Sequence, residues 1–206
     1  MIRRLSMAAL AVLIALPVAV QGQEDLMMRV DRSTNAADPD DVPEVTITPV
    51  DGGFEVRTGP AAIIWDEDQT ASGEFTLSAT FDLLEPSSHP NYYRLFYGGS
   101  RLDTDGQNYM YCLIAQSGTD IIKHRANNET VHDIMGRTPH DAINSGAASN
   151  DLEVRVGADE IEFVINGQVV HSTENAGMAG RTDGIYGVRI NHVIPSIRVE
   201  GLSVSH

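Results

Sequence analysis

Apolar and polar residues alternate without a break through residues 73–83, in the run Gly-Glu-Phe-Thr-Leu-Ser-Ala-Thr-Phe-Asp-Leu. Side chains on a strand point alternately to opposite faces, so this period of two predicts a long strand with one buried face and one solvated face. Strands of this kind are typical of antiparallel sheets, because the strands of a parallel sheet are covered on both faces and are apolar throughout.

Further strands separated by turns are predicted along the rest of the chain. Their ranges are 45–50, 54–57, 62–65, 92–97, 108–116, 121–125, 152–156, 161–165, 168–172, 185–191 and 197–204. Asn166-Gly167 lies between two of them and is typical of a type I′ hairpin turn, because both residues tolerate a positive φ. In the last strand the apolar phase shifts across Glu200-Gly201, which indicates a β-bulge.

Residues 126–150 carry the weakest strand pattern, and we expect a long loop there with a short strand near 130–134. About a dozen strands, without an internal repeat or helical periodicity, predict an all-β fold made of two antiparallel sheets packed as a sandwich. The residues expected in its core are Phe75, Leu77, Phe81, Val154, Phe163 and Ile165.

The first 22 residues predict an export signal. Arg3 and Arg4 precede an apolar stretch that is too short to span a membrane, and small residues flank a cleavage site before Gln23. We therefore expect a periplasmic or extracellular protein that is not inserted in a membrane once residues 1–22 are removed. Residues 23–43 are polar, acidic and proline-containing, which predicts a flexible linker, and residues 44–206 then form the sandwich domain.

The chain is acidic, with a formal net charge of −15 and a single lysine, Lys123. Phosphate backbones and anionic lipids would repel it, so nucleic acid and membrane surfaces are poor partners, and neutral or cationic ligands are easier to accommodate. Cys112 is the only cysteine, which excludes an intramolecular disulfide. Because it lies in an apolar strand, we interpret it as a small buried side chain rather than a reactive thiol.

Five of the six tyrosines fall between Tyr92 and Tyr111. A tyrosine ring stacks on the apolar face of a sugar while its hydroxyl forms hydrogen bonds, so an aromatic groove with neighbouring donors suits a neutral glycan. Aromatic residues also favour strands for packing reasons, so ordinary packing of a sheet beneath a loop is an equally open interpretation.

The candidate ligand site lies on the strands that carry spare aromatic and donor groups. Within one strand Tyr93 and Arg94 face opposite surfaces unless a bulge intervenes. Arg94 and Arg189 are expected to share a face, which provides two guanidinium donors for hydroxyls or a carboxylate. The candidate ligand-binding residues are Tyr93, Arg94, Tyr109, Tyr111, His124, Arg189 and Asn191.

Oxygen ligands gather in one turn, where Asp103, Asp105 and Asn108 are a candidate calcium site. Asp and Asn are also ordinary turn residues, and the pattern of an EF-hand is missing. No histidine pair has the spacing of a zinc site, and Gly-x-Ser-x-Gly is absent. Apart from calcium, we expect no cofactor.

The strand of residues 72–83 and the run Tyr93-Arg-Leu-Phe-Tyr-Gly-Gly resemble the concanavalin A-like lectin/glucanase superfamily. So do Phe163-Val-Ile-Asn-Gly-Gln-Val-Val and Asp183-Gly-Ile-Tyr-Gly-Val-Arg-Ile-Asn. The chain is most similar to exported bacterial laminin-G-like and 3-keto-disaccharide-hydrolase-like domains, over roughly residues 44–206. This resemblance implies a jelly-roll sandwich whose concave face often binds or cleaves carbohydrate.

The laminarinase-type Glu-x-Asp-x-x-Glu motif of that superfamily is absent, so no catalytic residue is carried over. The sequence therefore favours an exported, lectin-like module that binds a neutral carbohydrate without catalysis. Two alternatives stay open: a glycoside-active hydrolase whose acid/base pair comes from distant loops, and a structural partner in an envelope complex. Whether the protein is an enzyme is not settled by the sequence, because an acid/base pair is defined by its separation in space.

Overall fold

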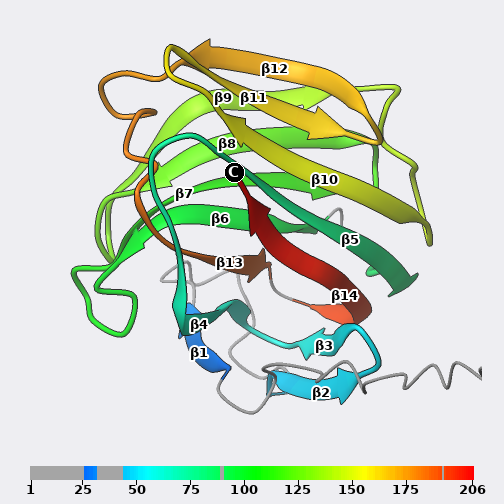
Figure 1. Cartoon of the computed structure of the whole chain (residues 1–206). Helices are drawn as coiled ribbons and strands as arrows, with labels where there is room; N and C mark the ends of the chain where they lie inside the picture. Colours follow the sequence, from blue (N-terminus) through cyan, green and yellow to red (C-terminus); the bar gives the residue numbers. More distant parts are fainter. Residues whose placement is uncertain (1–25, 32–43, 89–90, 192) are drawn as a thin grey trace, which may run out of the picture.

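The computed structural model describes residues 26–31, 44–88, 91–191 and 193–206, which form fourteen strands and their connections (Figure 1). The predicted signal peptide lies outside this part of the chain. Among the described residues, no helix has the length and apolar character needed to cross a membrane.

The strands form two seven-stranded sheets that face each other, as Figure 1 shows. Sheet A has the order β1 (Met27–Asp31), β4 (Ala61–Ala71), β13 (Gly184–Ile190), β6 (Tyr92–Ser100), β7 (Asn108–Ala115), β8 (Thr119–Arg125) and β9 (Val131–Pro139). Sheet B has the order β12 (Gln168–Glu174), β11 (Glu160–Ile165), β10 (Ser149–Val156), β5 (Phe75–Glu85), β14 (Ile194–Ser205), β3 (Gly53–Thr58) and β2 (Thr46–Val50). All pairings between neighbouring strands are antiparallel, which confirms the predicted jelly-roll sandwich.

The last two strands of the chain lie inside the sheets rather than at their edges. Strand β13 pairs with β4 on one side and β6 on the other. Strand β14 likewise pairs with β5 and β3. Both sheets are therefore assembled from segments that are far apart in the sequence.

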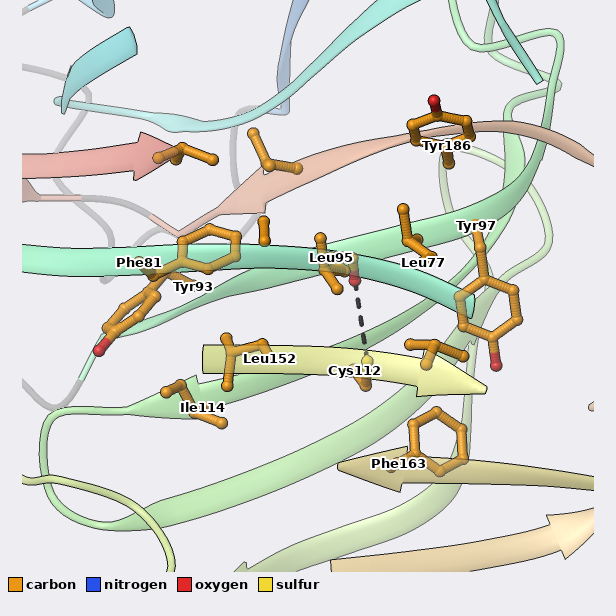
Figure 2. Close-up of a cluster of buried hydrophobic side chains, with 14 of the residues drawn as sticks. Leu77, Phe81, Tyr93, Leu95, Tyr97, Cys112, Ile114, Leu152, Phe163 and Tyr186 are labelled. Atoms are coloured by element: carbon orange, nitrogen blue, oxygen red, sulfur yellow. Dashed lines mark hydrogen bonds between the residues drawn. The ribbon is translucent and has the colours of Figure 1, made fainter. Parts of the chain in front are cut away.

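The main core lies between the sheets and is filled by the apolar faces of both. The alternating strand β5 buries its apolar residues and leaves its polar residues partly exposed, as its pattern predicts. All six residues predicted for the core are at most 4% exposed. Aromatic contacts join the two layers, with ring centroids 5.8 Å apart for Phe81–Tyr93 and 6.5 Å apart for Tyr97–Phe163 (Figure 2).

Cys112 also lies in this core, where its Sγ is 4.0 Å from the carbonyl oxygen of Leu95 (Figure 2). Burial raises the pKa of the Cys112 thiol to about 11. A thiol that is buried and protonated at neutral pH is not nucleophilic, which supports the interpretation of Cys112 as a packing residue.

Two local predictions at turns are confirmed. Asn166 and Gly167 have φ angles of 49° and 77°, as a type I′ turn requires. The pairing of β14 with β5 shifts register between Glu200 and Ser203, where Gly201 has a φ of 63°, so the predicted bulge is present.

Strand β4, expected only over residues 62–65, extends over Ala61–Ala71, and two further strands differ from the predictions. Residues 27–31, which we expected within a flexible linker, form β1 at the edge of sheet A. The short strand expected near 130–134 is β9, nine residues long. Both are edge strands with mostly exposed or half-buried side chains, so neither shows the full alternation that identifies a strand covered on one face.

Candidate ligand-binding face of sheet A

A second apolar cluster covers the face of sheet A that points away from sheet B. We call it the outer-face cluster. Its buried members come from sheet A and from the loop after β6, and they include five aromatic residues: Trp65, Tyr92, Phe96, Tyr109 and Tyr111. The apolar members Ile63, Leu102, Leu113 and Ala115 complete it. Sheet A is thus apolar on both faces, which explains why residues 92–97 and 109–115 show no simple alternation.

Two arginines, Arg125 and Arg189, lie next to the outer-face cluster and both pair with the carboxylate of Asp31. Arg189 Nη1 lies 2.9 Å from Asp31 Oδ2, and Arg125 Nη2 lies 2.8 Å from the same oxygen. The three side chains are between 7% and 10% exposed. The structure therefore contains a buried Arg–Asp–Arg cluster that joins β13, β1 and β8.

Aromatic rings hold Arg189 in place. Its Nη1 donates a hydrogen bond of 2.7 Å to the Tyr109 hydroxyl, and its guanidinium lies 5.0 Å from the centroid of the Tyr111 ring. Burial lowers the pKa of Arg189, but Tyr109 and Asp31 outweigh this effect and raise the pKa above its usual value. Burial raises the pKa of the Tyr109 hydroxyl, although Arg189 and Arg125 oppose this. Arg189 is thus charged and Tyr109 neutral at any physiological pH.

The contact between Asp31 and Arg125 shows that sheet A is strongly curved. Strand β1 is the first strand of the sheet and β8 the sixth, and in a flat sheet their axes would lie about 24 Å apart. Side chains of ordinary length meet across this span only if the sheet curls and twists around its outer face. The outer face is therefore concave, as the family resemblance implies.

Arg29 makes a second link across the same face. Its Nη2 lies 2.9 Å from Asp105 Oδ1 and 3.3 Å from Asn128 Oδ1, both in loops that adjoin β7 and β8. Arg29 and Asp31 pair in register with Ile63 and Ala61 of β4, so both side chains lie on the outer side of the sheet. Strand β1 is therefore tied across the concave face by two charged side chains, the cation Arg29 and the anion Asp31.

Of the predicted ligand residues, Tyr109, Tyr111 and Arg189 come together on this face. Tyr93 and His124 lie on the other side of the sheet. Tyr93 belongs to the main core, and the His124 ring bonds to Asn108 Oδ1 at 3.1 Å. Asn191 follows β13 and has a buried Oδ1 without a partner among the described residues.

Arg94 does not join Arg189, which corrects our expectation that the two guanidinium groups share a face. Arg94 Nη2 instead donates to the carbonyl oxygens of Glu153 and Val164 in sheet B, at 2.7 and 2.8 Å. The reason lies in β6: its ladder with β7 omits Arg94 and Leu95, and the Leu95 carbonyl contacts Cys112 Sγ in the core. The pairing of β6 with β7 is thus interrupted at Arg94, and the Arg94 side chain reaches sheet B instead of the outer face.

The residues of the candidate calcium site are engaged elsewhere. Asp105 pairs with Arg29, and Asn108 donates to the carbonyl oxygen of Ala126 at 3.4 Å and bonds to His124. Asp103 is exposed. Within the described part of the chain, no group of three or more His, Cys, Asp or Glu side chains is positioned to hold a metal ion. Calcium at this turn stays a prediction.

Sequence reasoning missed Asp31, Arg125 and Trp65 as neighbours of the candidate site. Arg125 ends a predicted strand, and Trp65 ends another, so a pattern of outward residues along each could have indicated them. Asp31 was missed because it lies in the predicted linker. The alternation of Arg29 and Asp31 with Met28 and Val30 was the available signal.

A separate depression lies on sheet B, near the start of β5 and the end of β10. It has a volume of about 560 Å³ and a polar lining that includes Glu74, Thr76, Arg155, Glu160 and Glu162. Arg155 is paired with Glu153 at 2.7 Å, so its charge is already compensated. We favour the outer face of sheet A as the ligand site, because aromatic rings and buried arginines recognise sugars better than an open acidic surface.

Comparison with known proteins supports the fold and leaves the function open. No family model and no curated protein matches the chain. Among solved structures, a carbohydrate-binding module of the CBM66 type from Bacillus subtilis is similar, with 10% identity, a TM-score of 0.60, and coverage of 79% of this chain and 92% of that chain. The carbohydrate recognition domain of Emp46p has 12% identity, a TM-score of 0.54 and coverage of 87% of both chains.

A third similar structure is an enzyme. Alginate lyase A1-II′, of polysaccharide lyase family 7, has 16% identity, a TM-score of 0.53, and coverage of 77% of this chain and 82% of that chain. At such low identity these likenesses concern the backbone alone. This chain has the fold of the concanavalin A-like jelly-roll sandwiches, a fold that carbohydrate-binding proteins and a polysaccharide lyase both use.

Proposed function

We propose that this protein is an exported, lectin-like module that binds carbohydrate on the concave outer face of sheet A without cleaving it. The observation that carries the proposal is the placement of two arginines in an aromatic surface on the concave side of a lectin-type sandwich. Guanidinium groups fixed by aromatic rings are donors already oriented for sugar oxygens, so little side-chain entropy is lost on binding.

The carbohydrate-binding neighbours support this proposal by fold analogy. Sugar-binding sites combine aromatic rings with a small number of fixed polar groups. The outer-face cluster has both, and because its rings are at most 7% exposed, a sugar reaches them only when the segments over this face move. The chain's net charge favours a neutral glycan in general.

The test is a glycan array that contains neutral and acidic oligosaccharides, probed with residues 23–206 and with the same protein carrying Arg189→Gln. We expect binding by the unchanged protein and a loss of at least about tenfold in affinity for the variant. Arg198→Gln, on sheet B, is the matched control and should bind normally. Equal binding by all three proteins would place the sugar elsewhere, and no binding at all would contradict the proposal.

The lyase among the similar structures favours one alternative, a carbohydrate-active enzyme. Incubation of the same oligosaccharides with the protein separates the two functions. Release of reducing ends or of unsaturated products, lost on substitution of a carboxylate, would show catalysis. Unchanged oligosaccharides that remain bound are the result we expect.

A further inference from the structure

The Arg–Asp–Arg cluster has the composition of a carboxylate-binding site that is already filled. Asp31 Oδ2 accepts from both Arg125 and Arg189, at 2.8 and 2.9 Å. Guanidinium groups are donors that proteins commonly use to bind carboxylates, those of ligands as well as those of their own side chains. The three groups differ in how firmly the rest of the protein holds them.

The two arginines are held independently of Asp31. Arg189 is fixed by the Tyr109 hydroxyl and the Tyr111 ring. Arg125 Nη1 donates to the carbonyl oxygen of Asn128 at 3.0 Å, in the loop that follows β8. The Nε atoms of both arginines are buried and have no partner among the described residues, so the pair has unused donors as well.

Asp31, in contrast, is supplied by a weakly packed strand. Strand β1 is five residues long, lies at the edge of sheet A and pairs only with β4. None of its residues is buried as a whole, although the Asp31 side chain is 8% exposed, and Met27 and Met28 are each 41% exposed. Besides its backbone ladder, its described polar contacts across the face are those of Arg29 and Asp31.

We infer that Asp31 occupies the place of a ligand carboxylate, and that the Arg125–Arg189 pair binds the carboxylate of a uronic-acid sugar when β1 moves off the concave face. This inference rests on the proposed carbohydrate-binding function and names its ligand class. A buried pair of guanidinium groups requires a negative charge to replace Asp31, because an uncharged sugar would leave two cations uncompensated. The strand thereby acts as an internal competitor that lowers the apparent affinity for the sugar.

The decisive variant is Asp31→Asn, which keeps the shape and the acceptor oxygen and removes only the competing charge. Binding is measured by calorimetry with galacturonate and glucuronate oligosaccharides, each compared with its methyl ester, which lacks the charge. We expect the variant to bind at least one of the acids about tenfold more tightly than the unchanged protein does, with no gain for the esters. Arg189→Gln introduced beside Asp31→Asn should abolish that gain.

Asp133→Asn is the matched control, because it removes one carboxylate from β9 of the same sheet, where Asp133 pairs with Lys123 at 2.8 Å. It should leave the affinity for the acids unchanged. If Asp31→Asn does not fold, Arg29→Gln replaces it, since it loosens β1 without touching the arginine pair, and it should likewise tighten binding of the acids.

The outcomes separate this inference from the proposed function. Acids and esters that bind equally well, with no gain on loosening β1, would overturn the inference and leave carbohydrate binding intact. Absence of binding by every sugar to every folded variant would overturn both.

Discussion

Arg94 and Arg189 are register partners on the neighbouring strands β6 and β13, yet their guanidinium groups lie on opposite sides of sheet A. Arg94 crosses the core to sheet B, whereas Arg189 lies among the aromatic rings of the outer face. Two residues of the same type at adjacent positions thus have different roles: one ties the two layers together and the other belongs to the candidate ligand site.

Arg94→Leu should destabilise the protein strongly. Arg94 is 1% exposed, and its guanidinium donates to two carbonyl oxygens of sheet B, which the variant would leave buried without these donors. Hydrogen bonds from a charged donor imply a loss of about 2–4 kcal/mol in the free energy of unfolding, measured by urea denaturation.

Arg198→Leu is the comparison, because Arg198 lies on sheet B with its nearest carboxylate oxygens 3.9 Å away and its side chain 37% exposed. It should cost less than about 1 kcal/mol. Equal losses for the two variants would show that the cross-sheet bonds of Arg94 add nothing to stability.

His124 should make the protein less stable in mild acid. Burial lowers the pKa of His124, and the charges of Arg181 and His132 lower it further. The folded state therefore binds this proton less tightly than the unfolded chain, whose histidine pKa is about 6.5. The stability linked to neutral His124 is fully present above a pH of about 6.5. It is lost as the pH falls from there toward the lower pKa of His124 in the folded state.

The measurement is the free energy of unfolding between pH 7.5 and about 5 for the natural protein and for His124→Gln. The variant should show a shallower decline, because His124 is the only titratable group that differs between the two proteins. Parallel curves would mean that His124 titrates alike in the folded and unfolded states.

Two substitutions of Asn166, in the hairpin turn, distinguish the contribution of its backbone conformation to stability from that of its side-chain hydrogen bonds. Asn166 has a φ of 49°, and its Nδ2 donates to the carbonyl oxygen of Ala142 at 2.7 Å and to Asn150 Oδ1 at 2.9 Å. Asn166→Gly loses the side-chain bonds but keeps the favoured backbone, whereas Asn166→Ala loses both.

We therefore expect Asn166→Ala to be less stable than Asn166→Gly by about 1 kcal/mol, in thermal or chemical denaturation. The difference between Asn166→Gly and the natural protein then measures the side-chain bonds alone. An alanine variant as stable as the glycine variant would contradict the left-handed conformation at this position.

Cys112 should be inert in the folded protein. Its side chain is 1% exposed and burial raises its pKa to about 11, so the thiolate is scarce and shielded at neutral pH. Reaction with a thiol-specific aromatic disulfide should proceed only in denaturant. Rapid labelling under native conditions would show that the core opens readily around β7.

The strands that could be predicted best are those with one solvated face and one buried face. Strand β5 has both a perfect alternation and neighbours on both sides, so its pattern reports its position directly. Strand β9 has a neighbour on one side only and few buried side chains, so its sequence carries little hydrophobic period. Strand β1 could not be predicted for the same reason, and it also lies in a segment whose composition resembles a linker.

The candidate site was predicted in part. Tyr109, Tyr111 and Arg189 were placed on the right strands because aromatic and donor residues stand out there. The contact of Asp31 with Arg189 joins residues 158 positions apart, and no local pattern encodes a contact of that kind. Arg94 lies where the pairing of β6 with β7 is interrupted, and strict alternation does not anticipate that its side chain reaches sheet B.

The position of β13 and β14 in the middle of their sheets has a consequence for how the chain is made. A ribosome supplies these two strands after all the other strands of the two sheets, and until they arrive β4, β6, β5 and β3 each expose an unpaired edge. Open edges of this kind invite pairing with other chains, and sheets that depend on distant segments close slowly. A chain cut short before residue 184 should therefore aggregate rather than fold. For a chain that includes both strands, the time between synthesis and closure of the two sheets is when it most needs a chaperone.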